Sequence, residues 1–172
     1  MDTRLSPIFA RRSVRSYTTD PVAHETVRSL LEAAMAAPSA RACDPWRFVV
    51  VRDGERRQAI ADLLPYGTMI AKAPVGIVVC GDLNAAHDGQ LSYLLQDCSA
   101  AIENLLLAAS MLGLGACWLG VHPREDRVNG MASLLGLPEA VVPVSAIAVG
   151  WPAEEHCPRT RYAEEAVHDE TW

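Results

Sequence analysis

The chain has 172 residues, half of them hydrophobic, so it is long enough to bury the core of one compact domain. Its formal net charge of −6 argues against a partner held mainly through a nucleic-acid backbone, because proteins of that kind carry a basic excess. No segment approaches the roughly 20 apolar residues of a membrane span and the N-terminus lacks the apolar core of a signal peptide, so we expect a cytoplasmic protein without membrane binding.

Hydrophobic spacing and helix-boundary residues predict two helices before the first strand. Ser6 and Pro7 suit the start of a short helix that runs into Arg11 and Arg12. A second helix is expected to begin at Asp20-Pro21 and to stop at Pro38, because the apolar residues between them recur at i, i+3, i+4 and i+7. Residues 46–52 are then predicted to form a strand.

Helices and strands are expected to alternate up to residue 150. Helices are predicted after Asp53-Gly54 as far as Leu64, over Ser92–Leu112 and over Glu125–Leu135, and strands over Val75–Cys80, Ala116–Val121 and Val144–Val149. The helix from Ser92 is apolar nearly all round, which indicates burial on most sides. Residues 151–172 are charged and lack core-forming periodicity, so we expect a C-terminal arm that needs another surface to rest on.

Alternating strands and helices first suggest a doubly wound nucleotide-binding fold. The one glycine-rich candidate, residues 113–118, precedes a strand, whereas the dinucleotide fingerprint follows one. Trp118 also stands where the third glycine is required. We therefore predict a single α+β domain over residues 1–172, with a mixed sheet of about four strands flanked by helices.

Cysteines and histidines offer no arrangement for metal binding or nucleophilic catalysis. The five cysteines include no CxxC pair, so neither a disulfide framework nor a zinc site is indicated, and most should be small buried hydrophobes. The five histidines are scattered, and no serine lies in a GxSxG turn. His122 follows a predicted strand, where it is either an ordinary loop residue or a substrate contact.

Two arginine clusters are the strongest candidates for binding. Arg11, Arg12 and Arg15 flank Ser13 next to a helix end, and their forked side chains suit a doubly charged phosphate. A second pair in the arm, Arg159 and Arg161, would point the same way in an extended chain. Each cluster taken alone is better explained as a solvated surface that makes weak ion pairs.

Several motifs taken together identify a family. They are RRSVR at residues 11–15, Pro38-Ser39 followed by PWRF at 45–48, GLGACWLG at 113–120 and GWPAEE at 150–155. In order and spacing the chain resembles the FMN-dependent nitroreductase family from about Leu5 to Trp172. The resemblance implies a three-layer α/β/α sandwich, an intertwined homodimer with FMN at the interface, and an arm, residues 151–172, that reaches the partner subunit.

The resemblance also implies roles for individual residues. The phosphate and ribityl chain of FMN are expected to be bound by Arg11, Arg12, Ser13 and Arg15, with Arg159 and Arg161 approaching from the C-terminal side. The other subunit would contribute Pro38, Ser39, Ala40 and Ala42. Leu119 and Gly120 would lie beside the reactive N5 and O4. Hydride would pass from NADH or NADPH to FMN N5 and then to a small planar acceptor such as a nitroaromatic or a quinone. Because the cofactor carries the chemistry, no side chain is expected to be an indispensable acid or base.

Two departures leave an alternative open. The family usually has asparagine and glutamine where this chain has Ala42 and Asp44, which removes one amide near the flavin and adds a carboxylate to the same loop. The alternative is a flavin-binding sensor or storage protein with little turnover. Relatives that dehalogenate or destroy flavins are a further possibility, although the chain lacks an obvious long lid insertion.

Overall fold

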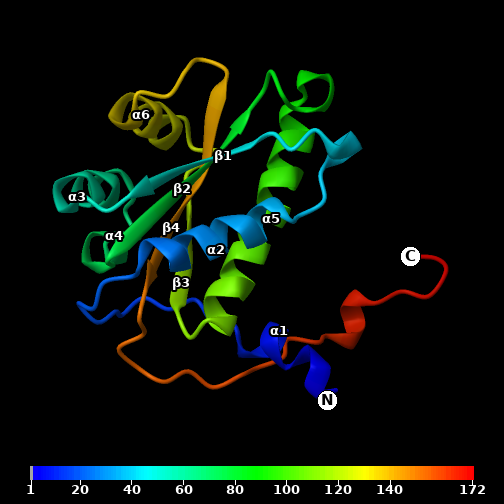
Figure 1. The fold of residues 1–172 in the computed structure, drawn as a ribbon. Helices are drawn as coiled ribbons and strands as arrows, with labels where there is room; N and C mark the ends of the chain where they lie inside the picture. The colour runs from blue at the N-terminus through cyan, green and yellow to red at the C-terminus, as the bar shows by residue number, and fades with distance from the viewer. Residues whose placement is uncertain (1) are drawn as a thin grey trace.

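The computed structural model describes residues 2–172, and its centre is a four-stranded sheet (Figure 1). The strands are β1 (Trp46–Val51), β2 (Val75–Asp82), β3 (Gly115–Gly120) and β4 (Val141–Gly150), and they lie in the order β1-β2-β4-β3. All four predicted strands form. The last begins at Val141, earlier than predicted, because β2 continues to Asp82 and pairs with it there.

The prediction of a mixed sheet is wrong for the strands of this chain, because every neighbouring pair is antiparallel. Strand–helix alternation suggested parallel pairing, but the connection after β1 contains two short helices that pack against each other. The start of β2 therefore lies beside the end of β1, with Gly76 opposite Val51. Within residues 2–172 the parallel pairing is confined to an isolated bridge between Ser13 and Ala116.

Residues 2–172 form six α-helices. They are α1 (Ser6–Ala10), α2 (His24–Met35), α3 (Gly54–Leu63), α4 (Met69–Lys72), α5 (Leu91–Met111) and α6 (Glu125–Leu135). The helix predicted from Asp20 starts only at His24, because Arg52 donates to the carbonyl oxygens of Val22 and Ala23 and the chain before them stays extended. The short α4 was not predicted from the sequence.

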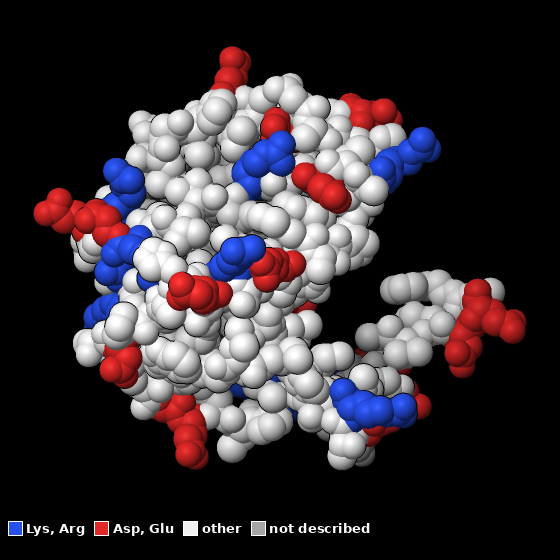
Figure 2. Space-filling view, in the orientation of Figure 1, with Lys and Arg blue, Asp and Glu red and all other residues white. Residues whose placement is uncertain are grey.

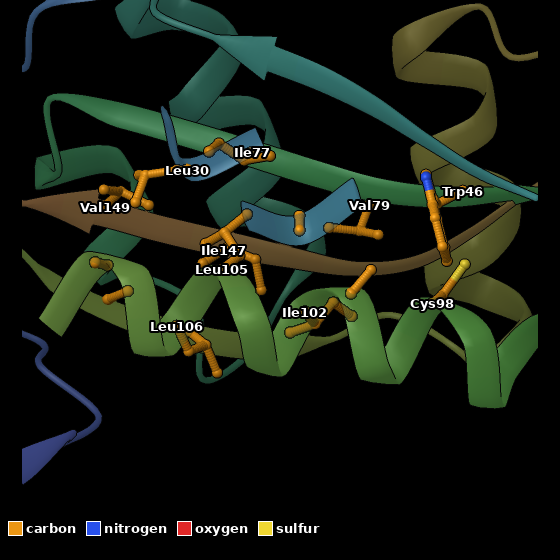
Figure 3. Close-up of a cluster of buried hydrophobic side chains, with 14 of the residues drawn as sticks. Leu30, Trp46, Ile77, Val79, Cys98, Ile102, Leu105, Leu106, Ile147 and Val149 are labelled. Atoms are coloured by element: carbon orange, nitrogen blue, oxygen red, sulfur yellow. The ribbon is translucent and has the colours of Figure 1, made fainter. Parts of the chain in front are cut away.

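Alternate residues of the strands supply two hydrophobic cores, one on each face of the sheet. Ile77 and Val79 of β2 face α2 and α5, where they pack against Leu30 and Leu105 (Figure 3). Residues of the opposite parity, such as Val78, face α3, α4 and α6. The period-two alternation of a strand thus produces the helix–sheet–helix layering.

The C-terminal segment, residues 151–172, contains neither a strand nor an α-helix. From Ala153 onward every residue except Ala163 is exposed. The segment passes α1 and then runs away from the rest of the chain (Figure 1), so that a hollow separates its end from the surface beside it (Figure 2). Across the residues that the structure describes, no helix combines the length and apolar character needed to cross a membrane.

Candidate functional site

Residues 11–15 lie along the start of the edge strand β3. The backbone N–H of Val14 donates to the carbonyl oxygen of Ala116 at 3.0 Å, and the Val14 side chain is buried. Gly115 makes this approach possible, since a Cβ there would lie 2.6 Å from Cβ of Val14. Val14 therefore anchors the segment, while its neighbours Arg12, Ser13 and Arg15 remain at least partly accessible.

Tyr17 contacts the same segment through its side-chain hydroxyl. Its hydroxyl donates to the carbonyl oxygen of Val14 at 2.6 Å and lies 3.3 Å from that of Ala148 in β4. Burial raises the pKa of the phenol well above its usual range, so the group stays a neutral donor. This contact joins the arginine-bearing segment to the central sheet.

The C-terminal segment returns to the same place. The backbone N–H of Ala153 donates to the carbonyl oxygen of Ser16 at 3.0 Å. The backbone N–H of Arg159 donates to the carbonyl oxygen of Phe9 at 3.1 Å. Residues from both ends of the chain consequently line one pocket of about 420 Å³, which we call the arginine pocket: Ile8, Phe9, Arg11, Arg12, Ser13, Arg15, Arg159, Thr160 and Arg161. The two clusters that the sequence analysis singled out are therefore brought together.

The donor set of the arginine pocket fits a phosphate. Five arginines and two hydroxyl residues line it, and none of its lining residues is acidic. The charge of Arg11 is partly neutralised by Glu103 of α5, whose Oε1 lies 3.1 Å from Nε of Arg11. The other four arginines make no ion pair with any residue in the range 2–172. Guanidinium groups gathered in this way repel one another unless an anion binds between them, and phosphate offers matching acceptors.

A second pocket, of about 210 Å³, continues along β3, and we call it the β3-edge pocket. Its lining residues are Arg15, Leu64, Tyr66, Gly67, Cys117, Trp118, Leu119, Gly120 and Arg127. Arg15 lines both pockets, so the two sites are contiguous. From Ala116 to Gly120 the strand covers about 13 Å at its usual rise.

The outer edge of β3 presents backbone groups to this pocket. The carbonyl of Ala116 points outward, toward Val14, so the backbone groups of Trp118 and Gly120 face the same way by strand alternation. Nothing lies within 4 Å of where a Cβ on Gly120 would be, which leaves open space beside the strand end. Predicted residues Leu119 and Gly120 therefore lie next to a free backbone edge, an arrangement suited to a flat ring with hydrogen-bonding atoms on its rim.

Six of the nine residues that line the β3-edge pocket were not predicted as site residues: Leu64, Tyr66, Gly67, Cys117, Trp118 and Arg127. Tyr66 follows α3 and is 86% exposed, and Trp118, which the sequence analysis treated as part of a strand end, is partly exposed. Arg127, in the first turn of α6, donates to the carbonyl oxygen of Gly120 at 3.0 Å. The sequence carries no signal for the exposure of Tyr66, and Arg127, which follows Gly120 by seven residues, belongs to no motif that would mark it.

The loop that contains Pro38, Ser39, Ala40 and Ala42 is not brought to either pocket. It lies beside the N-terminal part of α5, away from α1 (Figure 1). Asp97 of α5, only 5% exposed, accepts a hydrogen bond from the backbone N–H of Ala40 at 2.9 Å. Within one chain, the four loop residues and the arginines belong to separate surfaces.

Asp44, one of the two departures from the family pattern, has a local structural role. Its carboxylate accepts a hydrogen bond from the Ser39 hydroxyl, and its backbone N–H donates back to that hydroxyl at 3.0 Å. Ala42 has a φ of 54°, in the left-handed region that asparagine tolerates better than alanine. The carboxylate of Asp44 is thus engaged inside the loop.

His122 and the cysteines take no part in the two pockets, apart from Cys117. His122 lines neither pocket, and its backbone N–H donates to the carbonyl oxygen of Val144 at 3.1 Å. Cys80, Cys98 and Cys117 are buried, as predicted for most of the cysteines, whereas Cys157 is exposed. Burial raises the pKa of the Cys117 thiol, and nearby Arg15 opposes this shift, so Cys117 is a neutral part of the pocket wall.

The chain is similar to known proteins over nearly its whole length. The model of the Nitroreductase family matches residues 8–65 and 62–151. A protein of Methanothermobacter thermautotrophicus, provisionally named NADH dehydrogenase/NAD(P)H nitroreductase, is 44% identical over 168 residues, which cover 98% of this chain and 87% of that protein.

Two solved structures are also similar over their full lengths. A crystal structure from Parabacteroides distasonis, with the same provisional name, has a TM-score of 0.93 at 38% identity and covers 100% of both chains. A nitroreductase-like protein from Desulfovibrio desulfuricans, solved in complex with FMN, has a TM-score of 0.84 at 36% identity and covers 100% of this chain and 99% of that one.

Proposed function

Because the chain belongs to the nitroreductase family of oxidoreductases, we propose that its arginine pocket holds the phosphate of FMN and its β3-edge pocket holds the ring. The observation that carries this proposal is the acid-free arginine pocket, which continues through Arg15 to the free edge of β3. A phosphate between the two clusters would place an attached ring along Leu119 and Gly120. FMN supplies the hydride-transfer chemistry when bound.

The protein's own residues position the cofactor and shape its electrostatics. Arg12, Arg15 and Arg161 neutralise the phosphate through charge-assisted hydrogen bonds, with Ser13 as a further donor. Backbone N–H groups at Trp118 and Gly120 donate to the rim of the ring, where negative charge develops on reduction. The buried side chains of Leu119 and Cys117 form part of the wall of the β3-edge pocket and limit water around the ring.

The complete site requires a second copy of the chain. The loop from Pro38 to Ala42 does not reach its own arginine pocket. In the proposed dimer it would cover the flavin of the partner. Large apolar side chains on the arm and on α1 are exposed in one chain, among them Tyr162, Val167 and Ile8. An intertwined homodimer in which residues 151–172 cross to the partner would bury them.

The substrates are NADH or NADPH as hydride donor and a small planar acceptor, such as a nitroaromatic or a quinone. Donor and acceptor occupy the same place over the ring in turn, so the first product leaves before the second substrate binds. The test is anaerobic addition of each nicotinamide to FMN-loaded protein, followed by steady-state kinetics with nitrobenzene derivatives and quinones. Bleaching of the flavin and parallel-line kinetics are expected.

The sensor or storage alternative is decided by the same experiment. This alternative was based on Ala42 and Asp44. However, Asp44 is hydrogen-bonded to Ser39 within its own loop, which accounts for the Asp44 carboxylate. If neither nicotinamide bleaches the FMN of folded, fully loaded protein within minutes, the oxidoreductase proposal is abandoned in favour of a sensor.

A further inference from the structure

Arg127 is a cation in the β3-edge pocket to which the family resemblance assigns no role. The first turn of α6 carries it, and its side chain is half-buried. One guanidinium nitrogen donates to the carbonyl oxygen of Gly120 at 3.0 Å, which fixes the group at the end of β3. Although Glu125 and Asp126 are its neighbours in sequence, Arg127 forms no ion pair with any residue from 2 to 172.

The residues around Arg127 do not neutralise its charge, and they screen it less than bulk water would. None of the residues that line the β3-edge pocket is acidic, and Leu119 and Cys117 form a buried apolar part of its wall. The interaction of a fixed charge with a group inside such a pocket is screened less than it is in bulk water. Arg15 is the other cation of the pocket, but it also faces the phosphate site and donates to the carbonyl oxygen of Ser13.

We propose that Arg127 raises the reduction potential of FMN bound along β3, an inference that rests on the proposed function. Hydride transfer from NAD(P)H breaks a C–H bond of the dihydronicotinamide and leaves NAD(P)⁺. It adds two electrons and one proton to the bound cofactor, whose ring gains one negative charge. A guanidinium held beside Gly120 stabilises that charge more than it stabilises the neutral ring, and it thereby favours reduction.

The test separates the charge of Arg127 from its hydrogen bond. Arg127→Gln keeps a donor for the Gly120 carbonyl but removes the charge, whereas Arg127→Lys keeps both. For Arg127→Gln we expect the reduced-to-oxidised ratio at a fixed potential to fall about tenfold, a shift of about 30 mV for a two-electron couple. The affinity for oxidised FMN should change less than threefold. Anaerobic equilibration with an indicator dye gives the potential, and titration with FMN gives the affinity.

Exposed Arg124, which lies next to α6 but lines neither pocket, provides the matched control. Arg124→Gln and Arg127→Lys should both keep the wild-type potential within about 10 mV, a third of the tenfold shift. An unchanged potential in Arg127→Gln, or an equal fall in Arg127→Lys, would overturn the inference and leave the proposed function intact. Wild-type protein that binds no FMN would instead refute the proposed function, and the inference with it.

Discussion

The buried carboxylate of Asp97 accepts a hydrogen bond from the backbone N–H of Ala40 at 2.9 Å, although the two residues lie far apart in the sequence. This single contact attaches the loop that follows α2 to the side of α5. The second oxygen of Asp97 is buried without a hydrogen-bond partner among residues 2–172. The hydrogen bond to Ala40 offsets only part of the cost of burying this carboxylate, and it holds in place a loop with three residues at positive φ, Arg41, Ala42 and Asp44.

Removing this acceptor should loosen the loop. We expect Asp97→Ala to lower the free energy of unfolding by roughly 1 to 3 kcal/mol, because the N–H of Ala40 loses its partner. Asp97→Asn, which keeps the volume and one acceptor oxygen, should cost less. Chemical denaturation measures the stability, and proteolysis at Arg41 reports on the loop. Equal stability of Asp97→Ala and wild type would show that the contact is dispensable.

Loss of either arginine cluster should weaken FMN binding. Arg15→Ala and Arg161→Ala each remove a charged hydrogen bond worth roughly 1.5 to 3 kcal/mol, so the dissociation constant should rise about ten- to a hundredfold. Arg28→Ala serves as the control, since Arg28 pairs with Glu32 on the exposed side of α2. FMN titration followed by fluorescence measures the effect. Wild-type affinity in both pocket variants would remove the phosphate assignment.

The close approach of Gly115 and Val14 predicts a site-specific penalty for a methyl group. Gly115→Ala places a Cβ 2.6 Å from that of Val14, so it should destabilise the fold by about 1 to 3 kcal/mol and displace the arginine-bearing segment. Adding Val14→Ala should recover part of the loss, because it removes the two Val14 Cγ atoms that would lie 2.6 and 2.9 Å from the new Cβ, although the contact with the Val14 Cβ remains. Gly54→Ala, with its nearest neighbour at 3.7 Å, is the control. A double-mutant cycle with no coupling would contradict this packing account.

Truncation should separate dimer formation from phosphate binding. A chain that ends at Arg161 keeps all five arginines of the pocket but lacks the exposed apolar residues Tyr162, Val167 and Trp172. If the arm contributes to an interface on the order of 2,000 Å² or more, this variant should dissociate at protein concentrations where the full chain is dimeric. Light scattering at micromolar concentration provides the comparison. A full-length, FMN-loaded monomer under these conditions would contradict the dimer.

Because two cysteine thiols are buried, we expect the protein to lose stability at alkaline pH. Burial raises the pKa of Cys80 and of Cys98 to about 12, above the ordinary value of 9.0. The stability that comes from keeping these thiols neutral is fully present below pH 9 and is lost as the pH rises from 9 towards 12. Urea unfolding at pH 8, 9.5 and 11 should show this decline, with a shallower slope for Cys98→Ala. An identical slope in the variant would exclude Cys98 as a cause.

Local patterns predicted much of the secondary structure. The helix Glu125–Leu135 forms with the predicted bounds, because acidic residues start it and Gly136 adopts the left-handed conformation that ends it. The start of α2 was misplaced because its determinant is distant: Arg52 holds the carbonyl of Val22. Strand direction was also wrong, since hydrophobic alternation is the same in a parallel and an antiparallel neighbour.

The sequence by itself determined the four buried strands, the helices between them and the residue types of a phosphate site, because periodicity, caps and side-chain chemistry are local properties. Only the tertiary structure decided that Arg12 and Arg161 share one pocket, that the Pro38–Ala42 loop lies elsewhere, and that Arg127 is held against Gly120. Those relationships depend on how β3 pairs with β4 and on how the two ends of the chain meet. Long-range backbone pairing sets both, and no local pattern in the sequence records it.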